Sequence, residues 1–181
     1  MLMSEAFDTV LRQALRGEEP AWSNLFQRYA PAVLGFLRSI GADEPEDLLS
    51  ETFLQAARDL HAFHGNEQQF RSWIFTIARH RVIDAARQSA RRPAVNQAGM
   101  SALDHADSAT PSTAGVDDTV IANEEVFRLL ERLNPVEREI VALRFVADLD
   151  VKTVAAIVGK RPNTVTVMTR RALAKLHTAF T

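Results

Sequence analysis

The feature that most constrains the fold is a change of composition near the middle of the chain. Residues 89–118 are rich in Ala, Ser, Thr, Pro and Gly and contain few large apolar residues. Such a segment cannot bury enough apolar surface to offset the entropy lost on folding, so we predict a flexible linker. A structureless connection of this length is unusual inside one domain. We therefore divide the chain into a first domain at 1–90, a linker at 91–120 and a second domain at 121–181.

Apolar residues on both sides of the linker recur at the spacing of amphipathic helices. In the first domain this pattern is broken at Gly17, at Gly41 and in the loop HAFHGNEQQ at 61–69, which predicts four helices. The sequence therefore predicts an all-α protein made of two small helical domains joined by a linker.

Helix ends are marked most clearly in the second domain. Asn134 is followed by Pro135 and Glu137, which is typical of an N-cap, a first helical position and a capping box. Asp150 has the place of a second N-cap, and Gly159 that of a left-handed residue after the helix end. A last helix opens at Pro162 or Asn163 and runs to about Phe180.

Charge is distributed in blocks that the net value of −2 conceals. Residues 43–51 are acidic, residues 71–92 are basic, and residues 93–127 contain no Lys or Arg but six carboxylates. The C-terminal part is basic again. Such asymmetry indicates charged partners, with nucleic acid as the candidate for the basic blocks. The acidic blocks predict weak binding of the free protein to DNA.

The segment from Val151 to Leu176 has the pattern of a helix-turn-helix, with the turn at GKR. One face of the second helix, with Val165, Met168, Ala172 and Leu176, would anchor it. The open face would then present residues able to reach base edges and phosphates in a major groove: Arg161, Asn163, Thr164, Thr166, Val167, Arg170 and Arg171. A helical hairpin with a solvated charged face is the alternative for this pattern taken alone.

Aromatic and basic residues are interleaved in FRSWIFTIARHRVIDAARQ, from Phe70 onward. Single-stranded nucleic acid is held by this combination, with bases on aromatic rings and phosphates on Arg. For Trp73 alone a core position is the better interpretation. For Arg71, Arg79, Arg81 and Arg87 together we favour phosphate contact.

The helix at DEPEDLLSETFLQAARDL is acidic and would repel nucleic acid. Its exposed carboxylates would suit a basic surface on a protein partner, although from charge alone a solvated helix face is the better interpretation. The chain has no Cys, no secretory signal and no apolar run long enough to span a bilayer. We expect a cytoplasmic protein without membrane insertion. No metal cluster, cofactor motif or nucleophile–base pair is found, so we expect no cofactor and no enzymatic activity.

Taken in order, these segments resemble one family, the extracytoplasmic-function (ECF) sigma factors of RNA polymerase in the sigma-70 family. EDLLSETFLQAARDL resembles the segment that grips the coiled coil of the polymerase β′ subunit. FRSWIFTIARHRVIDAAR resembles the segment that melts the promoter and reads its minus-10 element. LERLNPVEREIVALRFVADLDVKTVAAIVGKRPNTVTVMTRRALAKL resembles the domain that reads the minus-35 element. The resemblance covers nearly the whole chain except the linker.

The resemblance implies roles for particular residues. Polymerase would be contacted by Asp47, Leu48, Glu51, Thr52 and Phe53. The minus-10 element and its melted strand would be bound by Phe63, His64, Asn66, Gln68, Arg71, Trp73, Arg79, Arg81 and Arg87. The minus-35 element would face the seven helix-turn-helix residues from Arg161 to Arg171 named above. The family commonly has Lys near Thr166 and Arg near Met168, so fewer phosphate contacts are expected there.

The implied partners are core RNA polymerase, promoter DNA and an anti-sigma factor that wedges between the two domains. We expect one copy per polymerase, and hence a monomer. Two other functions suit parts of the sequence. A two-domain helix-turn-helix regulator that does not replace sigma would bind paired half-sites as a dimer. A helical adaptor that contacts only proteins would be indifferent to charge reversal at Arg170 and Arg171.

Overall fold

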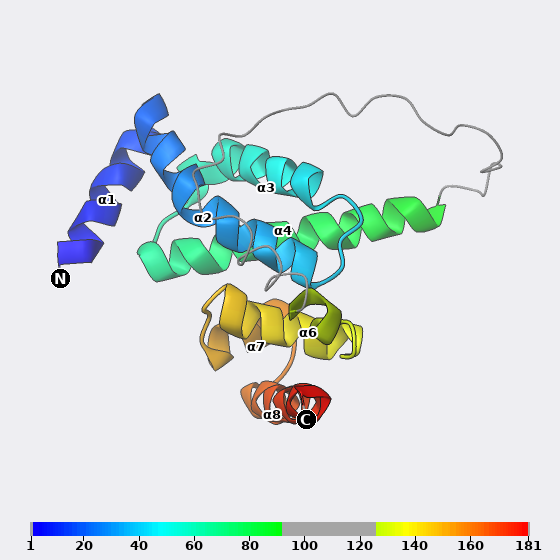
Figure 1. The fold of residues 1–181 in the computed structure, drawn as a ribbon. Helices are drawn as coiled ribbons and strands as arrows, with labels where there is room; N and C mark the ends of the chain where they lie inside the picture. The colour runs from blue at the N-terminus through cyan, green and yellow to red at the C-terminus, as the bar shows by residue number, and fades with distance from the viewer. Residues whose placement is uncertain (1, 92–125, 181) are drawn as a thin grey trace, which may run out of the picture.

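A computed structural model describes residues 2–91 and 126–180, and all of its regular structure in these ranges is helical (Figure 1). The expected all-α fold is therefore confirmed. The predicted linker at 91–120 lies outside the described residues apart from Arg91. The helices are α1 (Leu2–Leu15), α2 (Glu19–Ser39), α3 (Pro45–Asp59), η1 (Leu60–Ala62), α4 (Glu67–Arg91), α6 (Pro135–Val141), η2 (Ala142–Val146), α7 (Val151–Val158) and α8 (Pro162–Phe180).

The predicted helix ends in the second half are confirmed. Asn134 Oδ1 accepts from the Glu137 N–H at 2.9 Å, and Glu137 Oε2 accepts from the Asn134 N–H at 3.3 Å, which completes a capping box. Asp150 Oδ1 accepts from the N–H groups of Lys152 and Thr153 at 2.8 and 2.9 Å. Gly159 adopts the left-handed conformation, with φ of 65°.

Two local features differ from the expectation. Helix α4 begins at Glu67, inside the predicted loop, because Asn66 and Gln69 exchange side-chain to backbone hydrogen bonds of 3.0 and 2.9 Å in a further capping arrangement. The segment Ala142–Val146 forms a π-helical turn, where Ala147 N–H reaches the Ala142 carbonyl five residues back at 3.0 Å. Apolar periodicity does not distinguish such a turn from ordinary helix.

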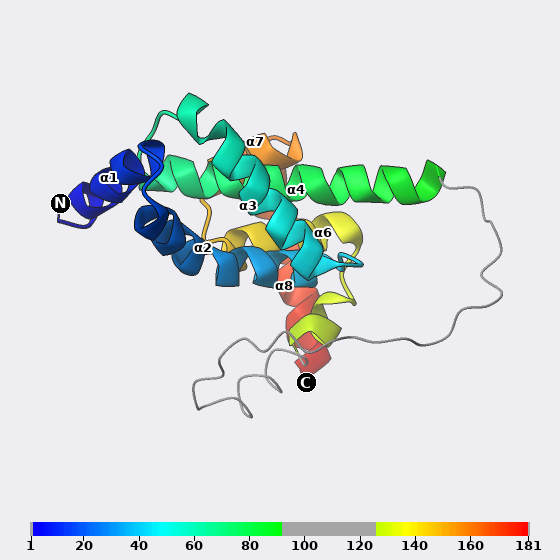
Figure 2. The same ribbon diagram turned by 90° about the horizontal axis from the view of Figure 1, so that it is seen from above.

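The first four helices surround an aromatic core. Helices α2, α3 and α4 pack against one another and α1 lies across one end (Figures 1 and 2). The Phe70 ring centroid lies 5.5 Å from that of Phe7 and 5.1 Å from that of Tyr29. Phe36 and Phe75 meet edge to face at 5.5 Å. The last turns of α4 extend beyond the neighbouring helices.

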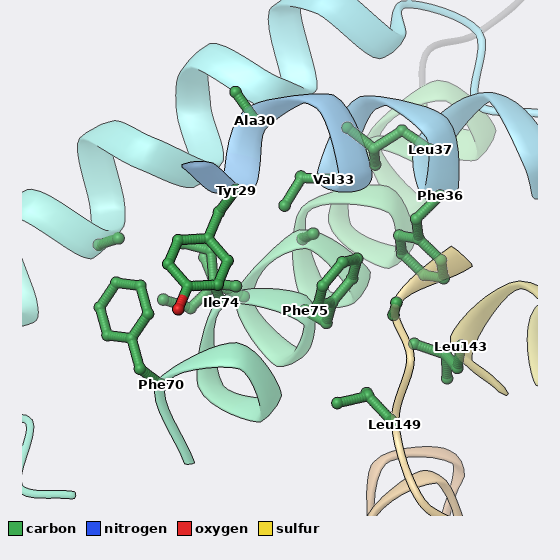
Figure 3. Packing of buried hydrophobic residues seen from close by; sticks show 14 of the residues in the cluster. Tyr29, Ala30, Val33, Phe36, Leu37, Phe70, Ile74, Phe75, Leu143 and Leu149 are labelled. Carbon is green, nitrogen blue, oxygen red and sulfur yellow. The ribbon is translucent and has the colours of Figure 1, made fainter. Parts of the chain in front are cut away.

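The second half packs directly against the first through α2 and α4. Leu143 and Leu149 lie opposite Phe36 and Phe75, and all four side chains are fully buried (Figure 3). The α2 backbone approaches η2 closely, since a Cβ at Gly35 would stand 3.2 Å from Val146 Cγ1. One hydrophobic core therefore runs through both halves. A smaller cluster inside the second half joins α8 to α6 and to the segment before it: Leu130, Leu133, Val141 and Ala172.

Candidate nucleic-acid interface

The loop that precedes α4 is held by its own aromatic residue. Phe63 is only 8% exposed, and its ring centroid lies 5.4 Å from that of Phe70 and 5.0 Å from that of Trp73. Phe63 therefore supports the loop from beneath, and its direct contact with DNA stays a prediction. His64, Asn66 and Gln68 are exposed, although the Asn66 side chain is engaged in capping α4.

A polar cluster fixes the first turn of α4 to α2. Glu67 Oε1 accepts from Arg28 Nη2 and, at 3.4 Å, from the Tyr29 hydroxyl. Burial, followed by the nearby Glu67 carboxylate, raises the pKa of Tyr29 to about 12. The phenol therefore stays a neutral donor at physiological pH, and the loop in front of α4 is anchored at its end.

A hollow of about 610 Å³ lies between the start of α4 and α7. Gln68, Ser72 and Thr76 follow one another at four-residue spacing along its α4 wall, beside Trp73, while Asp150 and Thr153 form the opposite wall. Amides, hydroxyls and an indole face are the groups that read and stack an exposed base. Ser72 and Thr76 are additional to the predicted set, although their four-residue spacing from Gln68 indicates them.

The four arginines predicted to hold phosphates all have protein partners in this structure. Arg79 Nε donates to Glu139 Oε1 at 2.6 Å, and Arg71 Nη1 donates to the Ala147 carbonyl oxygen at 3.3 Å. Both acceptors belong to the second half. The remaining two arginines share the carboxylate of Asp84. Arg81 Nη2 lies 3.4 Å from Asp84 Oδ2, and Arg87 Nη1 lies 3.7 Å from Asp84 Oδ1.

The residues predicted to contact polymerase divide into two groups. Leu48, Thr52 and Phe53 are buried, with at most 6% of each exposed, so they hold the helix in place, and their direct contact with polymerase stays a prediction. Asp47 and Glu51 are exposed. Leu54 was missed, yet it is 58% exposed and stands with them at helical spacing on one face of α3. The predicted set mixes buried and exposed positions because neighbouring residues of a helix point in different directions.

The exposed face of α3 borders a second hollow, of about 550 Å³, between α3 and α4. Its α3 side is acidic, with Asp43, Glu44, Asp47 and Glu51, and its α4 side includes Arg81. A negatively charged hollow beside an exposed leucine suits a basic, partly apolar protein surface.

The helix-turn-helix is formed by α7 and α8. Val165 and Ala172 are buried and Met168 and Leu176 are partly buried, which confirms the predicted anchoring face of α8. The seven residues predicted to face DNA are all exposed: Arg161, Asn163, Thr164, Thr166, Val167, Arg170 and Arg171. The Thr166 hydroxyl donates to the Pro162 carbonyl oxygen of its own helix at 3.1 Å.

Two negative findings concern the described ranges alone. Among residues 2–91 and 126–180 no three side chains of His, Asp or Glu are grouped as a metal site. Within the same ranges no helix has the length and apolar character needed to cross a bilayer.

Comparison with known proteins matches both halves. Residues 25–92 match sigma-70 region 2, and residues 123–176 match sigma-70 region 4. The ECF sigma factor BldN of Streptomyces coelicolor is 32% identical, over 92% of this chain, which spans 63% of that protein. The ECF sigma factor RpoE of Cereibacter sphaeroides is 31% identical, over 92% of this chain and 91% of its own length.

Two solved structures share the fold. CnrH, in complex with the cytosolic domain of CnrY, superposes with a TM-score of 0.65 at 22% identity and covers 95% of each chain. The sigma factor RpoE of Bartonella quintana, in complex with the anti-sigma factor NepR, gives a TM-score of 0.64 at 22% identity, over 85% of this chain and 92% of its own.

Sigma-70 regions 2 and 4, in this order along one all-helical chain, define a promoter-recognition subunit of RNA polymerase. The chain belongs to the sigma-70 family and is a sigma factor of the ECF type.

Proposed function

We propose that this sigma factor binds core RNA polymerase through α3, opens promoter DNA along α4 and reads the minus-35 element with α8. The observation that carries the proposal is the order of the two matched regions along one chain. It acts by binding, without catalytic chemistry of its own, in the cytoplasm and as one copy per polymerase.

Polymerase binding is assigned to the outer face of α3. Asp47 and Glu51 supply charge, and Leu54 supplies an apolar contact, while the buried Leu48, Thr52 and Phe53 hold the helix in place. A rim of charge around an exposed apolar side chain is typical of protein interfaces.

DNA contacts are divided between the two halves, with domain limits at 1–90 and 121–181. The melted minus-10 strand is assigned to His64, Asn66, Gln68, Trp73 and the arginines of α4, with Ser72 and Thr76 added by the geometry of the hollow. The minus-35 duplex is assigned to the seven exposed residues of the α7–α8 unit. An anti-sigma factor is a further proposed partner, because CnrH and the Bartonella RpoE were each solved with a binding partner.

The decisive experiment is transcription in vitro with core polymerase added to genomic DNA fragments and start sites mapped. We expect a defined set of start sites that depend on this protein, and retention of the protein on immobilised core enzyme. Replacing Asp47 and Glu51 together by Lys should abolish retention. Glu131→Lys, at an exposed position of the second half, is the control and should leave it unchanged.

A second pair of variants separates DNA reading from polymerase binding. Replacing Arg170 and Arg171 by Ala should abolish the promoter-specific transcripts, while the protein is still retained on immobilised core polymerase. Arg132→Ala, at an exposed position, is the control and should leave both unchanged. Tight binding of specific duplex DNA by a dimer in the absence of polymerase would contradict the proposal and favour an independent regulator.

A further inference from the structure

Helix α8 has an outer face opposite to the one that anchors it. The helix packs on α6 and α7 and lies beyond α7, away from α2 and α4 (Figure 1). Val165 and Ala172 are fully buried on its inner face. At about 100° per residue, Asn163, Val167 and Arg170 lie on the line directly opposite. When the N-terminal half of such a helix enters a major groove, this line approaches the base edges most closely.

The two polar side chains on the outer line are available for binding. Both residues are exposed, and within 2–91 and 126–180 neither the Asn163 amide nor the Arg170 guanidinium has a hydrogen-bond or ion-pair partner. An amide can pair with the edge of adenine, and a guanidinium with guanine or a phosphate. Polar contacts are therefore supplied on both sides of position 167.

Val167, between these two side chains, is apolar and 39% exposed. Its methyl groups cannot form a hydrogen bond with a base. Against valine, the polar major-groove edges of guanine, adenine and cytosine would lose water and gain no partner, which is unfavourable. Thymine differs from them because its edge carries a 5-methyl group beside one acceptor oxygen. An apolar side chain at this place therefore favours thymine.

Thr166 brings another methyl group next to Val167 in the sequence. Its hydroxyl donates to the Pro162 carbonyl oxygen at 3.1 Å, so the hydroxyl hydrogen is engaged within the helix. Thr169 has the same arrangement, with its hydroxyl donating to the Val165 carbonyl oxygen at 2.8 Å. The exposed Thr166 then offers DNA its methyl group and an oxygen that acts only as an acceptor.

We propose that Val167, assisted by Thr166, is a specificity-determining residue of α8 and selects thymine in the minus-35 element through the 5-methyl group. The inference rests on the proposed function, because it takes α8 as the helix that enters the minus-35 duplex. The thymine methyl group is buried against the valine, and burial of one methyl group corresponds to roughly fourfold in affinity.

The first test selects minus-35 sequences with the complete holoenzyme. The full chain and core polymerase transcribe a pool of one mapped promoter in which only the minus-35 positions are randomised, and the templates that yield transcripts are sequenced. We expect thymine to be enriched at one or two positions. Transcription without any enriched thymine would overturn the inference and leave the proposed function intact. Absence of all transcription that depends on this protein would refute the proposed function and the inference with it.

The second test replaces each enriched thymine by uracil, which removes the 5-methyl group and leaves both the base pairing and the protein unchanged. Uracil should weaken binding of the holoenzyme roughly fourfold, measured by competition with fluorescent promoter DNA. Equal binding of thymine and uracil duplexes by the natural chain would overturn the inference.

A protein variant then shows which side chain senses the methyl group. Val167→Ser replaces both methyl groups by a hydroxyl and should bind the thymine and uracil duplexes equally. Leu173→Ser is the matched control, because Leu173 is 42% exposed on the same helix but lies beyond the N-terminal half that contacts bases. It should keep the roughly fourfold difference. A difference that persists in Val167→Ser would contradict the role of Val167.

Two variants at position 166 separate its methyl group from its hydroxyl. Thr166→Ser keeps the hydroxyl and loses the methyl group, whereas Thr166→Val keeps the methyl group and loses the hydroxyl. The preference for thymine over uracil should fall more in Thr166→Ser than in Thr166→Val. The reverse order would show that the hydroxyl reads the base, against the assisting role of the methyl group.

Discussion

At the first turn of α6, Glu137 serves two partners at once. Its side chain is 7% exposed, accepts from Lys175 Nζ at 2.8 and 2.7 Å, and caps the backbone N–H of Asn134. The hydrogen bond from Lys175, followed by that from the Asn134 backbone, lowers the pKa of Glu137 below its ordinary value of 4.5. One carboxylate therefore joins the start of α6 to α8, the helix that carries the predicted DNA contacts.

Replacing Glu137 by Gln should lower the free energy of unfolding at neutral pH by about 1 kcal/mol, a modest value because Lys175 is half exposed and water screens the pair. Since folding lowers this pKa, the charge contributes fully above pH 4.5 and its contribution disappears as the pH falls through the folded-state pKa. Urea unfolding at neutral pH and in acid measures the difference. The exposed Glu131→Gln is the control, and a penalty for Glu137→Gln that persists in acid would contradict the role of charge.

At the scale of elements, the turn between α7 and α8 determines how the recognition helix is presented. Asp150 begins α7, and Gly159 ends it in the left-handed conformation, with the Lys160 N–H bonded to the Ala155 carbonyl at 2.9 Å. Ala155 is buried where the two helices meet. The orientation of α8 therefore depends on a backbone conformation that other residues adopt at a cost.

Gly159→Ala should destabilise the protein by about 1–2 kcal/mol, the cost of a left-handed conformation for a residue with a Cβ. The new Cβ would meet no atom within 4 Å, so the effect reports backbone strain alone. Gly17→Ala is a matched control, since Gly17 has φ of +79° and equally open surroundings. Both variants should lose similar stability in thermal unfolding, but only Gly159→Ala should also weaken transcription that depends on the minus-35 element. Equal loss of that activity in both would contradict the assignment.

At the scale of the whole molecule, the two halves share a core that neither possesses alone. Phe36 and Phe75 of the first half are covered by Leu143 and Leu149 of the second, and Gly35 allows the backbones to approach. Separate domains joined by a linker would unfold independently. A shared core couples them, because loss of one half exposes apolar surface on the other.

We therefore expect unfolding in urea to be one transition. Both tryptophans, Trp22 and Trp73, lie in the first half and report on it alone, whereas far-ultraviolet circular dichroism reports on both halves. The two signals should coincide in the natural chain. Gly35→Leu, which does not fit against Val146, should separate them, while Gln27→Leu at an exposed position of α2 should not. Separate transitions in the natural chain would refute the coupling.

Local rules in the sequence were sufficient for the number of helices in the first half, for the helix ends of the second half and for the family. Apolar spacing located the helices, and Asn134, Asp150 and Gly159 marked ends that depend only on neighbouring residues. The exposed set on α8 was also predictable, because a helix with one clear apolar face leaves the opposite face to solvent.

Tertiary packing alone decided which helix faces are covered by which neighbour, and which of the predicted contact residues are buried. Apolar spacing shows that a face will be covered but not by which neighbour, so it could not show that Phe75 and Arg79 face the second half. Phe53 is of a residue type common at binding surfaces, yet the ring of Phe26, far away in sequence, packs against it. Phe63 is buried by Phe70 and Trp73 of the helix that follows its loop. Both geometries exist only once the helices have packed.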